Sequence, residues 1–424
     1  MEPTHRRTFL KAAGATTALS AFPNLLLGAP ANNAKLKIGL LGCGGRGTGA
    51  ASQALAADDN TILWSIGDVF DTQIPKALNN LKRFEGRLEV PQERQFSGLD
   101  AFQKVIESGV DVVLLTTPPG FRPQHMRAAI EAGKHVFAEK PMAVDVAGVK
   151  SVMETARIAK EKGLTLQHGY CWRFDPGVRE GYGKLLAGEL GRVISVYGTY
   201  LSNVPKPSTS IDQRDANWGD VEWQVRNWMG HEWLSGGPLL EQAIHTVDKV
   251  SWAMGDVDPI AARGGGGRTQ RTDDGNVWDH YDVAYEYPDG VMCHVGQRQH
   301  SGCFNEVVDR VFCEKGTLEA PGRVLTKDPS GKMTWAYRAA PADMYQVCHN
   351  EWFAAIRKGE PLNTGELMVR STMLGILGRE AAHTGQRITW ADLWKSGQDL
   401  APDSFNLSDA NPVAPVPKPG THKI

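Results

Sequence analysis

The sequence has few cysteines and almost no net charge. Its six cysteines form no C-x-x-C pair, so neither a zinc knuckle nor a dithiol redox motif is indicated, and small buried thiols are expected. No group of histidines, cysteines and carboxylates has metal-ligand spacing, and no metal site is predicted. The formal net charge is -2, with 46 Lys and Arg against 48 Asp and Glu, which provides no overall basic charge for nucleic-acid binding. A small-molecule partner is therefore favoured.

The sequence also lacks an apolar run long enough for a comfortable transmembrane helix. The mildly apolar stretch that ends at Leu27 is interrupted by glycine, serine and proline, follows the pair Arg6 and Arg7, and precedes the small-residue site 29–31. This order of parts resembles a twin-arginine export signal, and an ordinary basic amphipathic start is the alternative. We expect residues 1–31 to be a signal peptide and the mature protein to be exported to the periplasm without a stable membrane span.

A glycine-rich turn follows in the chain. Residues 36–57, LKIGLLGCGGRGTGAASQALAA, have the order of strand, turn and helix that dinucleotide-binding units use. The glycine spacing allows a tight turn, close approach of the backbone to a pyrophosphate, and close helix packing, with the phosphates at the helix N-terminus. The pattern predicts that the cofactor contacts Gly42, Gly44, Gly45, Arg46 and Gly47.

An acidic residue lies where such units place one. The next apolar run, TILWSIGDVF, contains Asp68, about 20 residues beyond the last glycine of the turn. A carboxylate there accepts hydrogen bonds from the hydroxyls of the adenosine ribose and repels a 2′-phosphate. The sequence therefore predicts NAD as cofactor; a structural glycine turn with a surface aspartate is the alternative.

Alternating helical and apolar extended segments predict an α/β fold. Helical segments near 72–84, 101–107 and 146–162 alternate with apolar strands such as VDVVLLTTPP, which indicates a parallel sheet covered on both faces. From residue 191, longer strands of alternating polarity indicate a large, mainly antiparallel open sheet. We predict a Rossmann-like, doubly wound NAD-binding domain over 35–165, a C-terminal α+β domain over 166–395, and a Pro-rich tail over 396–424 that is either mobile or lies on a neighbouring subunit.

The segment HVFAEKPMA, residues 135–143, ends an apolar strand with Glu139, Lys140 and Pro141. The residue before a proline disfavours the helical conformation, so Lys140 is expected to stay extended and to project its ammonium from the strand end. Ligands of open α/β sheets bind in the crevice outside the carboxyl ends of the strands. A solvated surface ion pair at an ordinary turn is the alternative.

Four segments occur in an order that resembles a known protein family. The glycine turn, TTPPGFRPQH, AEKP and SGGPLLEQAIHTVD are arranged as in the glucose-fructose oxidoreductase, inositol dehydrogenase and MocA (Gfo/Idh/MocA) family, and the resemblance extends over about residues 35–393. It implies an NAD(P)-dependent oxidoreductase that acts on sugars or cyclitols and forms a homo-oligomer, a dimer or tetramer, through the open sheet.

The resemblance assigns roles to residues around AEKP. Lys140 matches the lysine beside the nicotinamide and the reacting hydroxyl, so it is predicted to be catalytic and to contact both cofactor and substrate. Glu139 is expected near the nicotinamide ribose, and Pro141 is expected to hold the turn with a cis Lys140–Pro141 bond. The remaining cofactor contacts that the resemblance implies are Thr117, Pro118, His125 and Arg173, of which Arg173 faces the cofactor or the substrate.

The resemblance implies a second catalytic motif in GGPLLEQAIHTVD. Glu241 and His245 have the i, i+4 spacing that places two side chains on one face of a helix, and both are predicted to be catalytic and to contact substrate. A neighbouring carboxylate would raise the pKa of His245. Many family members have Asp in place of Glu241 and Gly in place of Pro238, which leaves the role of Glu241 open, and a core position is the alternative for His245.

Four tryptophans between the two motifs are each five residues apart, at 218, 223, 228 and 233. This spacing fits neither a helix face nor a strand face and predicts a loop. Indole rings such as that of Trp228 could stack on a sugar, and packing of a long connection is the equal alternative. Candidates for reading hydroxyls beside them are Arg226, Asn227 and His231. A glycine-rich segment, 264–282, is a candidate second active-site loop that carries Asp279 and His280.

The predicted reaction interconverts a hydroxyl and a ketone on a sugar, glycoside or cyclitol by hydride transfer to NAD, with Lys140 polarising the oxygen and His245 taking the proton. One alternative is an NAD-dependent glycoside hydrolase or lyase that uses transient oxidation and elimination. Another is a non-catalytic sugar or nucleotide sensor, which predicts a missing Lys or His, whereas both are present. Export favours a bound, recycled cofactor, because free NAD is scarce outside the cytoplasm.

Overall fold

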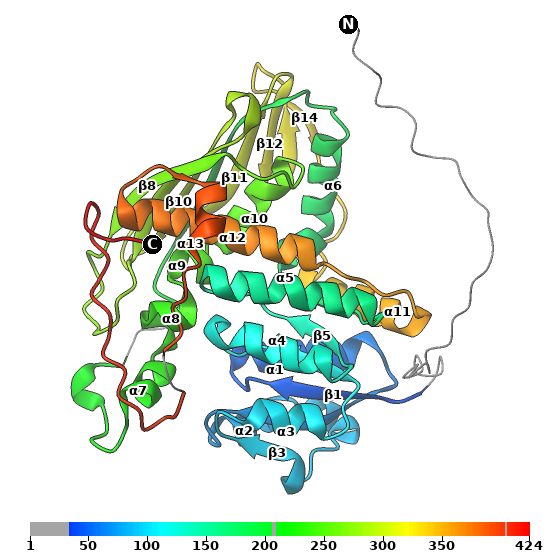
Figure 1. The fold of residues 1–424 in the computed structure, drawn as a ribbon. Coiled ribbons are helices and arrows are strands. Elements are labelled where there is room, and N and C mark those ends of the chain that lie inside the picture. The colour runs from blue at the N-terminus through cyan, green and yellow to red at the C-terminus, as the bar shows by residue number, and fades with distance from the viewer. Residues whose placement is uncertain (1–33, 206–208, 403–404) are drawn as a thin grey trace, which may run out of the picture.

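The computed structural model describes residues 34–205, 209–402 and 405–424, and it contains two domains (Figure 1). A six-stranded sheet forms the centre of the first domain and a nine-stranded sheet that of the second. In Figure 1 the first domain lies at the bottom and the second above it, with the long helices α5 and α12 between the two sheets. The predicted α/β class is confirmed. The predicted export signal, residues 1–31, lies outside the described residues.

The first sheet has the strand order β3-β2-β1-β4-β5-β6, and all neighbouring strands are parallel. Its central strands are apolar throughout because helices cover both faces, which confirms the Rossmann-like domain. The strand order reverses at β1, and a crevice for ligands is expected at its carboxyl end. The elements are β1 (Leu36–Leu41), α1 (Gly45–Ala57), β2 (Thr61–Asp68), α2 (Gln73–Asn80), β3 (Gln95–Ser97), α3 (Ala101–Glu107), β4 (Val112–Leu115), α4 (Arg122–Glu131), β5 (His135–Ala138), α5 (Val146–Glu161) and β6 (Leu166–His168).

The second sheet has the strand order β14-β13-β12-β11-β7-β10-β9-β8-β15. Among the described strands of this second sheet, only β7 and β10 pair in parallel, so the sheet is mostly antiparallel, as predicted. Its strands are β7 (Val193–Ser202), β8 (Ala261–Gly267), β9 (His280–Glu286), β10 (Met292–Gln299), β11 (Glu306–Cys313), β12 (Gly316–Ala320), β13 (Leu325–Lys327), β14 (Met333–Ala336) and β15 (Ile388–Thr389).

The glycine run at the start of 264–282 corrects one prediction, because it belongs to strand β8 and not to a loop. A Cβ on Gly266 would lie 2.2 Å from the carbonyl oxygen of His280, and one on Gly264 would lie 2.9 Å from that of Asp282. Both carbonyls belong to β9, which pairs with β8. Glycine is therefore used here so that two strands can approach closely, and its presence does not indicate a flexible active-site loop.

Two C-terminal helices tie the domains together. Helix α11 (Met344–Lys358) joins the core of the first domain through Trp352 and Phe353. Helix α12 (Gly365–Thr384) is buried along nearly its whole length, where it packs against α5, α10 and β8. The remaining helices are α6 (Pro176–Leu186), α7 (Asp220–Arg226), α8 (Glu232–Ser235), α9 (Pro238–Glu241), α10 (Ile244–Ala253) and α13 (Trp390–Ser396).

The C-terminal tail, residues 397–424, packs along the surface of the same chain. In Figure 1 it runs as a red trace from α13 down to α7 and back up. The indole nitrogen of Trp278 donates to the carbonyl of Pro417 at 3.1 Å, and the N–H of Gly420 donates to the carbonyl of Thr384 at 2.9 Å. Polar groups of the tail thus find partners within its own chain, and contact of the tail with a neighbouring subunit stays a prediction.

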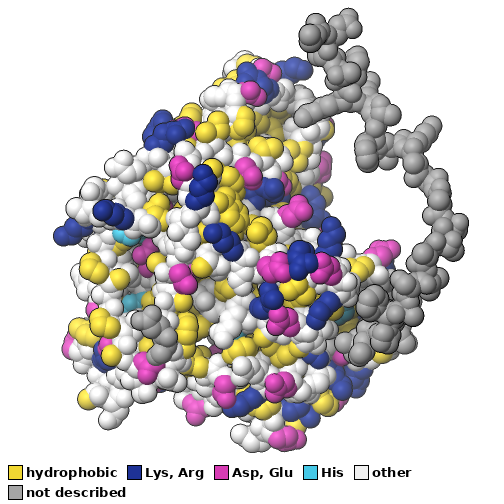
Figure 2. Space-filling view, viewed as in Figure 1, with side chains coloured by type: hydrophobic (Ala, Val, Ile, Leu, Met, Phe, Trp, Pro, Cys, Tyr) yellow, Lys and Arg dark blue, Asp and Glu magenta, His cyan; other side chains and the backbone are white. Residues whose placement is uncertain are grey.

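The surface fits the composition. On the face seen in Figure 2, basic and acidic side chains are intermixed, without a large patch of one sign. Five of the six cysteines are buried and unpaired, as expected, and Cys303 is exposed. Within the part of the chain that the structure describes, no helix combines the length and the apolar character needed to span a membrane.

Candidate active site

A cleft of about 760 Å³ lies between the two domains, at the carboxyl ends of the first sheet. This is the position at which open α/β sheets bind their ligands. The first domain contributes the glycine turn and the ends of β2, β4 and β5, and the second contributes the region of α7, α9 and α10. Predicted site residues that line the cleft are Gly42, Gly44, Gly45, Arg46, Gly47, Asp68, Thr117, Pro118, Glu139, Lys140, Trp228, Glu241 and His245.

The glycine turn has the geometry that its spacing predicts. Gly42 has a φ of +91°, a conformation that favours glycine. A Cβ on Gly47 would lie only 1.8 Å from the carbonyl oxygen of Gly42, whereas a Cβ on Gly44 or Gly45 would meet nothing within 4 Å. The turn is thus closed toward the sheet and open toward the cleft, where the N-terminus of α1 presents its first N–H groups. This arrangement suits an anion such as a diphosphate.

Asp68 is held at the end of β2 by the backbone of two neighbouring turns. Its Oδ2 accepts from the N–H of Cys43 at 2.7 Å, and its Oδ1 accepts from the N–H of Phe70 at 2.9 Å. Burial raises the pKa of Asp68, and these hydrogen bonds oppose the rise. The carboxylate therefore stands fixed at the rim of the cleft, next to the glycine turn, with oxygen lone pairs left for hydroxyl groups.

Glu139 pairs across the cleft floor with Arg46. Arg46 Nε lies 2.6 Å from Glu139 Oε1, and its guanidinium lies over the ring of Tyr345, 4.7 Å from the ring centroid. Tyr345 comes from α11 and also lines the cleft. Sequence reasoning missed Tyr345, since it lies far beyond the last of the motifs and belongs to none of them. The alternative that Glu139 and Lys140 form a solvated surface ion pair is wrong, since Glu139 is buried.

Lys140 points away from this pair and toward the second domain. The Lys140–Pro141 peptide bond is cis, as the resemblance implied. Lys140 Nζ donates to the backbone carbonyl of Glu241 and lies 3.7 Å from Glu241 Oε1, with the lysine side chain 13% exposed. The strand end of one domain and the helix of the other thus meet at this ammonium group.

Glu241 and His245 do not share one continuous helix. Helix α9 ends at Glu241, and α10 begins at Ile244, with a break at Gln242 and Ala243. Both side chains nevertheless line the cleft. The prediction of one helix face was wrong in detail, because the positive-φ glycines before Pro238 start a short separate turn that ends before α10.

His245 lies in an environment of positive charge. It is 9% exposed, and its Nδ1 has no hydrogen-bond partner among the described residues. Burial lowers the pKa of His245 well below its ordinary value, and the positive charges of Lys140 and Lys249 lower it further. The expected rise of this pKa is therefore wrong, because the carboxylate of Glu241 faces Lys140 and is not among the groups that shift the histidine.

Arg173 does not line the cleft and corrects a further prediction. Its Nε lies 2.9 Å from Asp248 Oδ2, and its Nη2 lies 2.7 Å from Asp256 Oδ1. Asp248 is on α10, and Asp256 follows that helix. With both edges of the guanidinium engaged in these pairs, Arg173 joins the first domain to α10 and has no edge free for cofactor or substrate.

His125 lies beside the cleft, in a smaller adjoining pocket. Its Nδ1 is 3.1 Å from the hydroxyl of Thr117, and its ring stacks on Phe102 with centroids 4.4 Å apart. Burial, with the nearby charge of Arg122, lowers its pKa to about 3. A contact between His125 and a cofactor remains a prediction, and its position restricts that contact to the adjoining pocket.

The spacing of the four tryptophans predicted one loop, and this prediction was wrong. Trp223 lies in α7 and Trp233 in α8, and only Trp218, Trp223 and Trp228 line the cleft. Arg226 fills the space between them and the first domain, because its guanidinium lies 4.0 Å from the ring centroid of Phe70 and 4.2 Å from that of Trp218. The segment that carries the tryptophans thus both packs against the first domain and lines the cleft. Of the other candidates, Asn227 lines the cleft and His231 lines a separate cavity.

Asp279 and His280 lie outside the cleft. Asp279 is buried and accepts the backbone N–H groups of Thr269, Gln270 and Arg271, so it organises a surface turn. Two groups among the described residues bring possible metal ligands within 4.8 Å of one another, although no sequence spacing indicated them. They are Asp279, His280 and His300, and Glu380, His383 and His422.

Sequence reasoning also missed three polar residues at the cleft. Arg122 is buried, and its guanidinium donates to the carbonyls of Thr117 and Pro141, so it holds the ends of β4 and β5 together. Tyr200 and Gln242 come from β7 and the break before α10. Burial raises the pKa of Tyr200 to about 12. Arg122 lies in the motif TTPPGFRPQH and Gln242 in SGGPLLEQAIHTVD, whereas Tyr200 lies in neither.

Family models match both domains. A model described as oxidoreductase family, NAD-binding Rossmann fold, matches residues 36–170, and a model described as GFO/IDH/MocA C-terminal domain matches residues 184–319. The two matches follow the division between the sheets, and together they cover more than half of the chain.

Individual proteins that resemble this chain share only a low sequence identity with it. A scyllo-inositol 2-dehydrogenase (NAD(+)) of Bacillus subtilis (strain 168) is 25% identical over 177 residues, 38% of this chain and 51% of that protein. A glycosyl hydrolase family 109 protein of Shewanella baltica (strain OS195) is 25% identical over 253 residues, 54% of this chain and 52% of that protein. The chain thus spans about half the length of these curated relatives. A levoglucosan dehydrogenase solved with NADH and levoglucosan shares the fold, with a TM-score of 0.65 and 19% identity over 84% of this chain and 99% of that chain.

Proposed function

Since the chain belongs to the Gfo/Idh/MocA family of oxidoreductases, we propose that it uses NAD to interconvert a hydroxyl group and a ketone on a sugar, glycoside or cyclitol. The observation that carries the proposal is that Lys140, Glu241 and His245 line the same cleft as the glycine turn and Asp68. The substrate class is supported by the names of the similar proteins, which mention scyllo-inositol and levoglucosan.

The first-domain side of the cleft fits NAD. Gly44 and Gly45 leave the backbone open for a diphosphate at the N-terminus of α1, and Asp68 offers a fixed carboxylate for the ribose hydroxyls. Thr117, Pro118 and the Arg46–Glu139 pair line the continuation of this wall toward Lys140. When bound, NAD supplies the hydride acceptor.

Lys140 and His245 divide the handling of the proton. His245 lines the cleft, and its lowered pKa keeps the ring neutral at neutral pH, so it can accept the hydroxyl proton. The ammonium of Lys140 donates a hydrogen bond to the substrate oxygen and stabilises negative charge there. Glu241 acts as a positioning residue, because its carbonyl accepts from Lys140 and its carboxylate lies 3.7 Å away.

The first experiment is mass spectrometry of the purified protein for bound NAD, followed by a panel of sugars, cyclitols and glycosides scored for NADH and for keto products. A substrate that yields a keto product with wild-type protein and not with His245→Ala supports the proposal. A protein that binds neither NAD nor NADH would contradict it.

A redox-assisted glycosidase is a second candidate, favoured by the similarity to a glycosyl hydrolase family 109 protein over 54% of the chain. In such a reaction a ketone next to a C–H bond makes that proton acidic, and elimination then expels the aglycone. The same glycoside panel separates the two candidates, since release of the aglycone without net NADH indicates the glycosidase.

Two further proposals concern location and assembly. The order of parts in residues 1–31 supports export by the twin-arginine route, which cell fractionation of the full chain and an Arg6→Lys, Arg7→Lys variant tests. Tyr197 and Phe312, which are 45% and 40% exposed on neighbouring strands β7 and β11, support a homo-oligomer formed through the open sheet. Light scattering of wild type and of a Tyr197→Arg variant tests this.

A further inference from the structure

A smaller pocket of about 220 Å³ adjoins the cleft beyond Asp68. It shares Asp68, Val69 and Thr117 with the cleft. The rest of its first-domain lining comes from the ends of β1 and β2, from the loops after β3 and β4, and from α3 and α4. Because the acid at the end of the second strand binds the adenosine ribose in doubly wound domains, a pocket next to that acid is where the adenine ring extends. One lining residue does not belong to the first domain. It is Phe405, in the C-terminal tail.

Phe405 is placed by other aromatic rings. Its centroid lies 5.9 Å from that of Phe121 on the pocket wall and 5.8 Å from that of Trp233 in α8. The side chain remains 37% exposed, although it is large and apolar and lies at the rim of a pocket. A flat ring entering this pocket would cover the exposed part of Phe405 and remove apolar surface from water.

Backbone hydrogen bonds hold the tail in this position. The N–H of Glu222 donates to the carbonyl of Leu407 at 3.1 Å, and the N–H of Val221 donates to that of Asp409 at 3.2 Å. Both donors lie in the first turn of α7, so the tail caps this helix. A Cβ on Gly219 would lie 2.4 Å from the Leu407 carbonyl oxygen, so glycine is required for this close contact.

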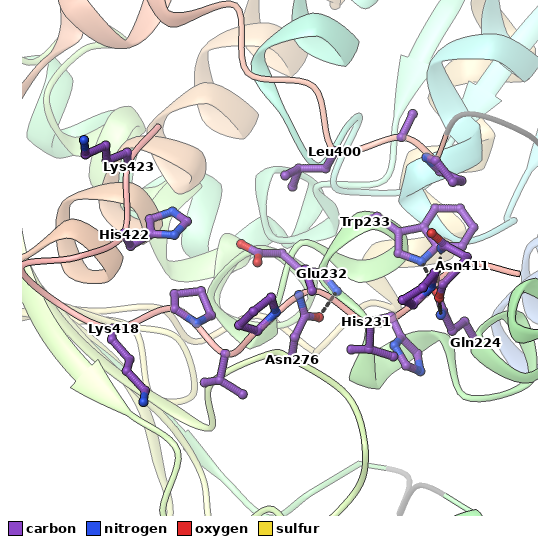
Figure 3. A pocket seen from close by; sticks show the side chains of 18 of the residues that line it. Gln224, His231, Glu232, Trp233, Asn276, Leu400, Asn411, Lys418, His422 and Lys423 are labelled. Atoms are coloured by element: carbon purple, nitrogen blue, oxygen red, sulfur yellow. Dashed lines mark hydrogen bonds between the residues drawn. The ribbon is translucent and has the colours of Figure 1, made fainter.

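Side chains extend the attachment on either side. Figure 3 shows Gln224 and Asn411 facing each other, with Asn411 Nδ2 donating to Gln224 Oε1 at 2.9 Å. The tail then passes over a cavity of about 710 Å³ and reaches His422, whose Nε2 lies 3.2 Å from Glu380 Oε2. Leu407 packs on a small apolar cluster that also contains Phe121 and joins both domains. The tail is thus attached to the second domain while Phe405 faces the first.

We propose that the C-terminal tail is part of the cofactor site, with Phe405 as the outer wall of the adenine pocket. The inference rests on the proposed function, in that the ligand is NAD. The tail would then be attached through α7 to the segment that lines the substrate side of the cleft, and it would slow the release of the adenine end of the cofactor. Such retention suits an enzyme that works where free NAD is scarce.

Calorimetric titration with three ligands tests the proposal. Phe405→Ala should weaken the binding of NAD and of ADP-ribose by at least about fivefold, the low end of what loss of an aromatic surface against a base costs. Nicotinamide mononucleotide, which has no adenine, should bind equally to both proteins. A wild-type protein that binds none of the three contradicts the proposed function itself, whereas equal NAD affinity of wild type and variant overturns only the role of Phe405.

Two matched variants control for the change itself. Val413→Ala alters an apolar tail residue that is also 37% exposed but lines the other cavity, and Phe304→Ala makes the same substitution at a site that is 72% exposed. Both should bind NAD as wild type does. If either weakens NAD as much as Phe405→Ala does, or if Phe405→Ala weakens nicotinamide mononucleotide equally, a local adenine contact is ruled out. If the alanine variant does not fold, Phe405→Leu serves in the same titrations.

Proteolysis gives a readout that needs no turnover. Because coupling between two binding events is reciprocal, a tail that stabilises the bound adenine must itself be stabilised by it. ADP-ribose should therefore slow chymotryptic cleavage after Phe405 by about fivefold or more at saturation, and nicotinamide mononucleotide should leave the rate unchanged. An unchanged cleavage rate with saturating ADP-ribose would overturn the proposal.

Discussion

The two walls of the cleft are built in different ways. The first-domain wall is mostly backbone, since Gly44 and Gly45 present bare main chain and the carboxylate of Asp68 is held by two N–H groups. The second-domain wall consists of side chains on short, interrupted helices, with His245 and Trp228 facing the cleft. The cofactor wall therefore depends on side chains being absent, and the substrate wall on particular side chains being present.

The walls also differ in how charge is balanced. The hydrogen bonds to Asp68 are local, from residues near it in space along the same sheet edge. His245 has no hydrogen-bond partner for Nδ1 among the described residues, and its pKa depends on burial first and then on the charge of Lys140 from the opposite domain. The chemistry of the second wall therefore depends on how the two domains dock.

The largest expected effect is at the junction of the walls. Lys140→Met should reduce turnover by at least about a hundredfold, the scale for losing a positioned proton-transfer or electrostatic group, while NAD affinity and melting temperature stay close to wild type. Lys150→Met, at an exposed position on α5, is the control and should be neutral. Normal turnover of Lys140→Met would make Lys140 a structural residue.

The glycine turn gives the next largest effect, and here stability and binding separate. Gly47→Ala should lower the free energy of unfolding by about 1–3 kcal/mol, because its Cβ would lie 1.8 Å from the Gly42 carbonyl oxygen. Gly44→Ala should leave stability unchanged and weaken NAD, since its Cβ points into open space toward the cleft. Denaturant unfolding and NAD titration of both, with Gly86→Ala as control, check this. Equal NAD affinity of Gly44→Ala and wild type would contradict the proposal that the diphosphate binds at this turn.

Cofactor choice is expected to be a smaller effect. Wild type should bind NAD more than tenfold more tightly than NADP, a preference of at least about 1.4 kcal/mol, because Asp68 repels a 2′-phosphate. Asp68→Asn should reduce that ratio, and titration of both cofactors into both proteins measures it. A wild-type preference for NADP would reverse the assignment of Asp68.

The pH dependence sharpens the electrostatic contrast. Because burial and the charge of Lys140 lower the pKa of His245, the acidic limb of the kcat/KM profile should lie below the ordinary histidine value of about 6.5. Glu241→Gln should leave the limb in place, and Lys140→Met should move the His245 pKa upward, as followed by NMR titration. A downward shift of the limb in Glu241→Gln would restore the carboxylate as the partner of His245.

The smallest effect concerns the attachment of the tail to the second domain. The hydrogen bond to Glu380 raises the pKa of His422, so its contribution to stability is complete below the unfolded pKa of about 6.5 and is lost as the pH rises through the raised folded value. His422→Ala should therefore lower the melting temperature more at about pH 5.5 than at about pH 8.5. The effect should stay below about 1 kcal/mol, since the ion pair is partly exposed. If His422→Ala lowers the melting temperature equally at both pH values, the contribution of His422 comes from packing and not from its charge.

Prediction from sequence succeeded for the first wall and failed in parts of the second. The glycine spacing, the position of Asp68 and the AEKP segment led to residues that line the cleft. Arg173, predicted to face cofactor or substrate, is instead paired with Asp248 and Asp256. No local pattern indicated Tyr345 or Phe405, because they reach the site from segments hundreds of residues away.

The parallel sheet, its glycine turn and the acid that follows could be predicted from the amino-acid sequence alone, because they depend on backbone sterics and on side-chain periodicity within a few dozen residues. Tertiary structure alone decided the charge around His245, the interruption between Glu241 and His245, and the course of the tail along α7. Desolvation and Coulomb interactions depend on what surrounds a group in space. Lys249 lies on α10 with His245, but Lys140 reaches His245 only after the two domains have packed together.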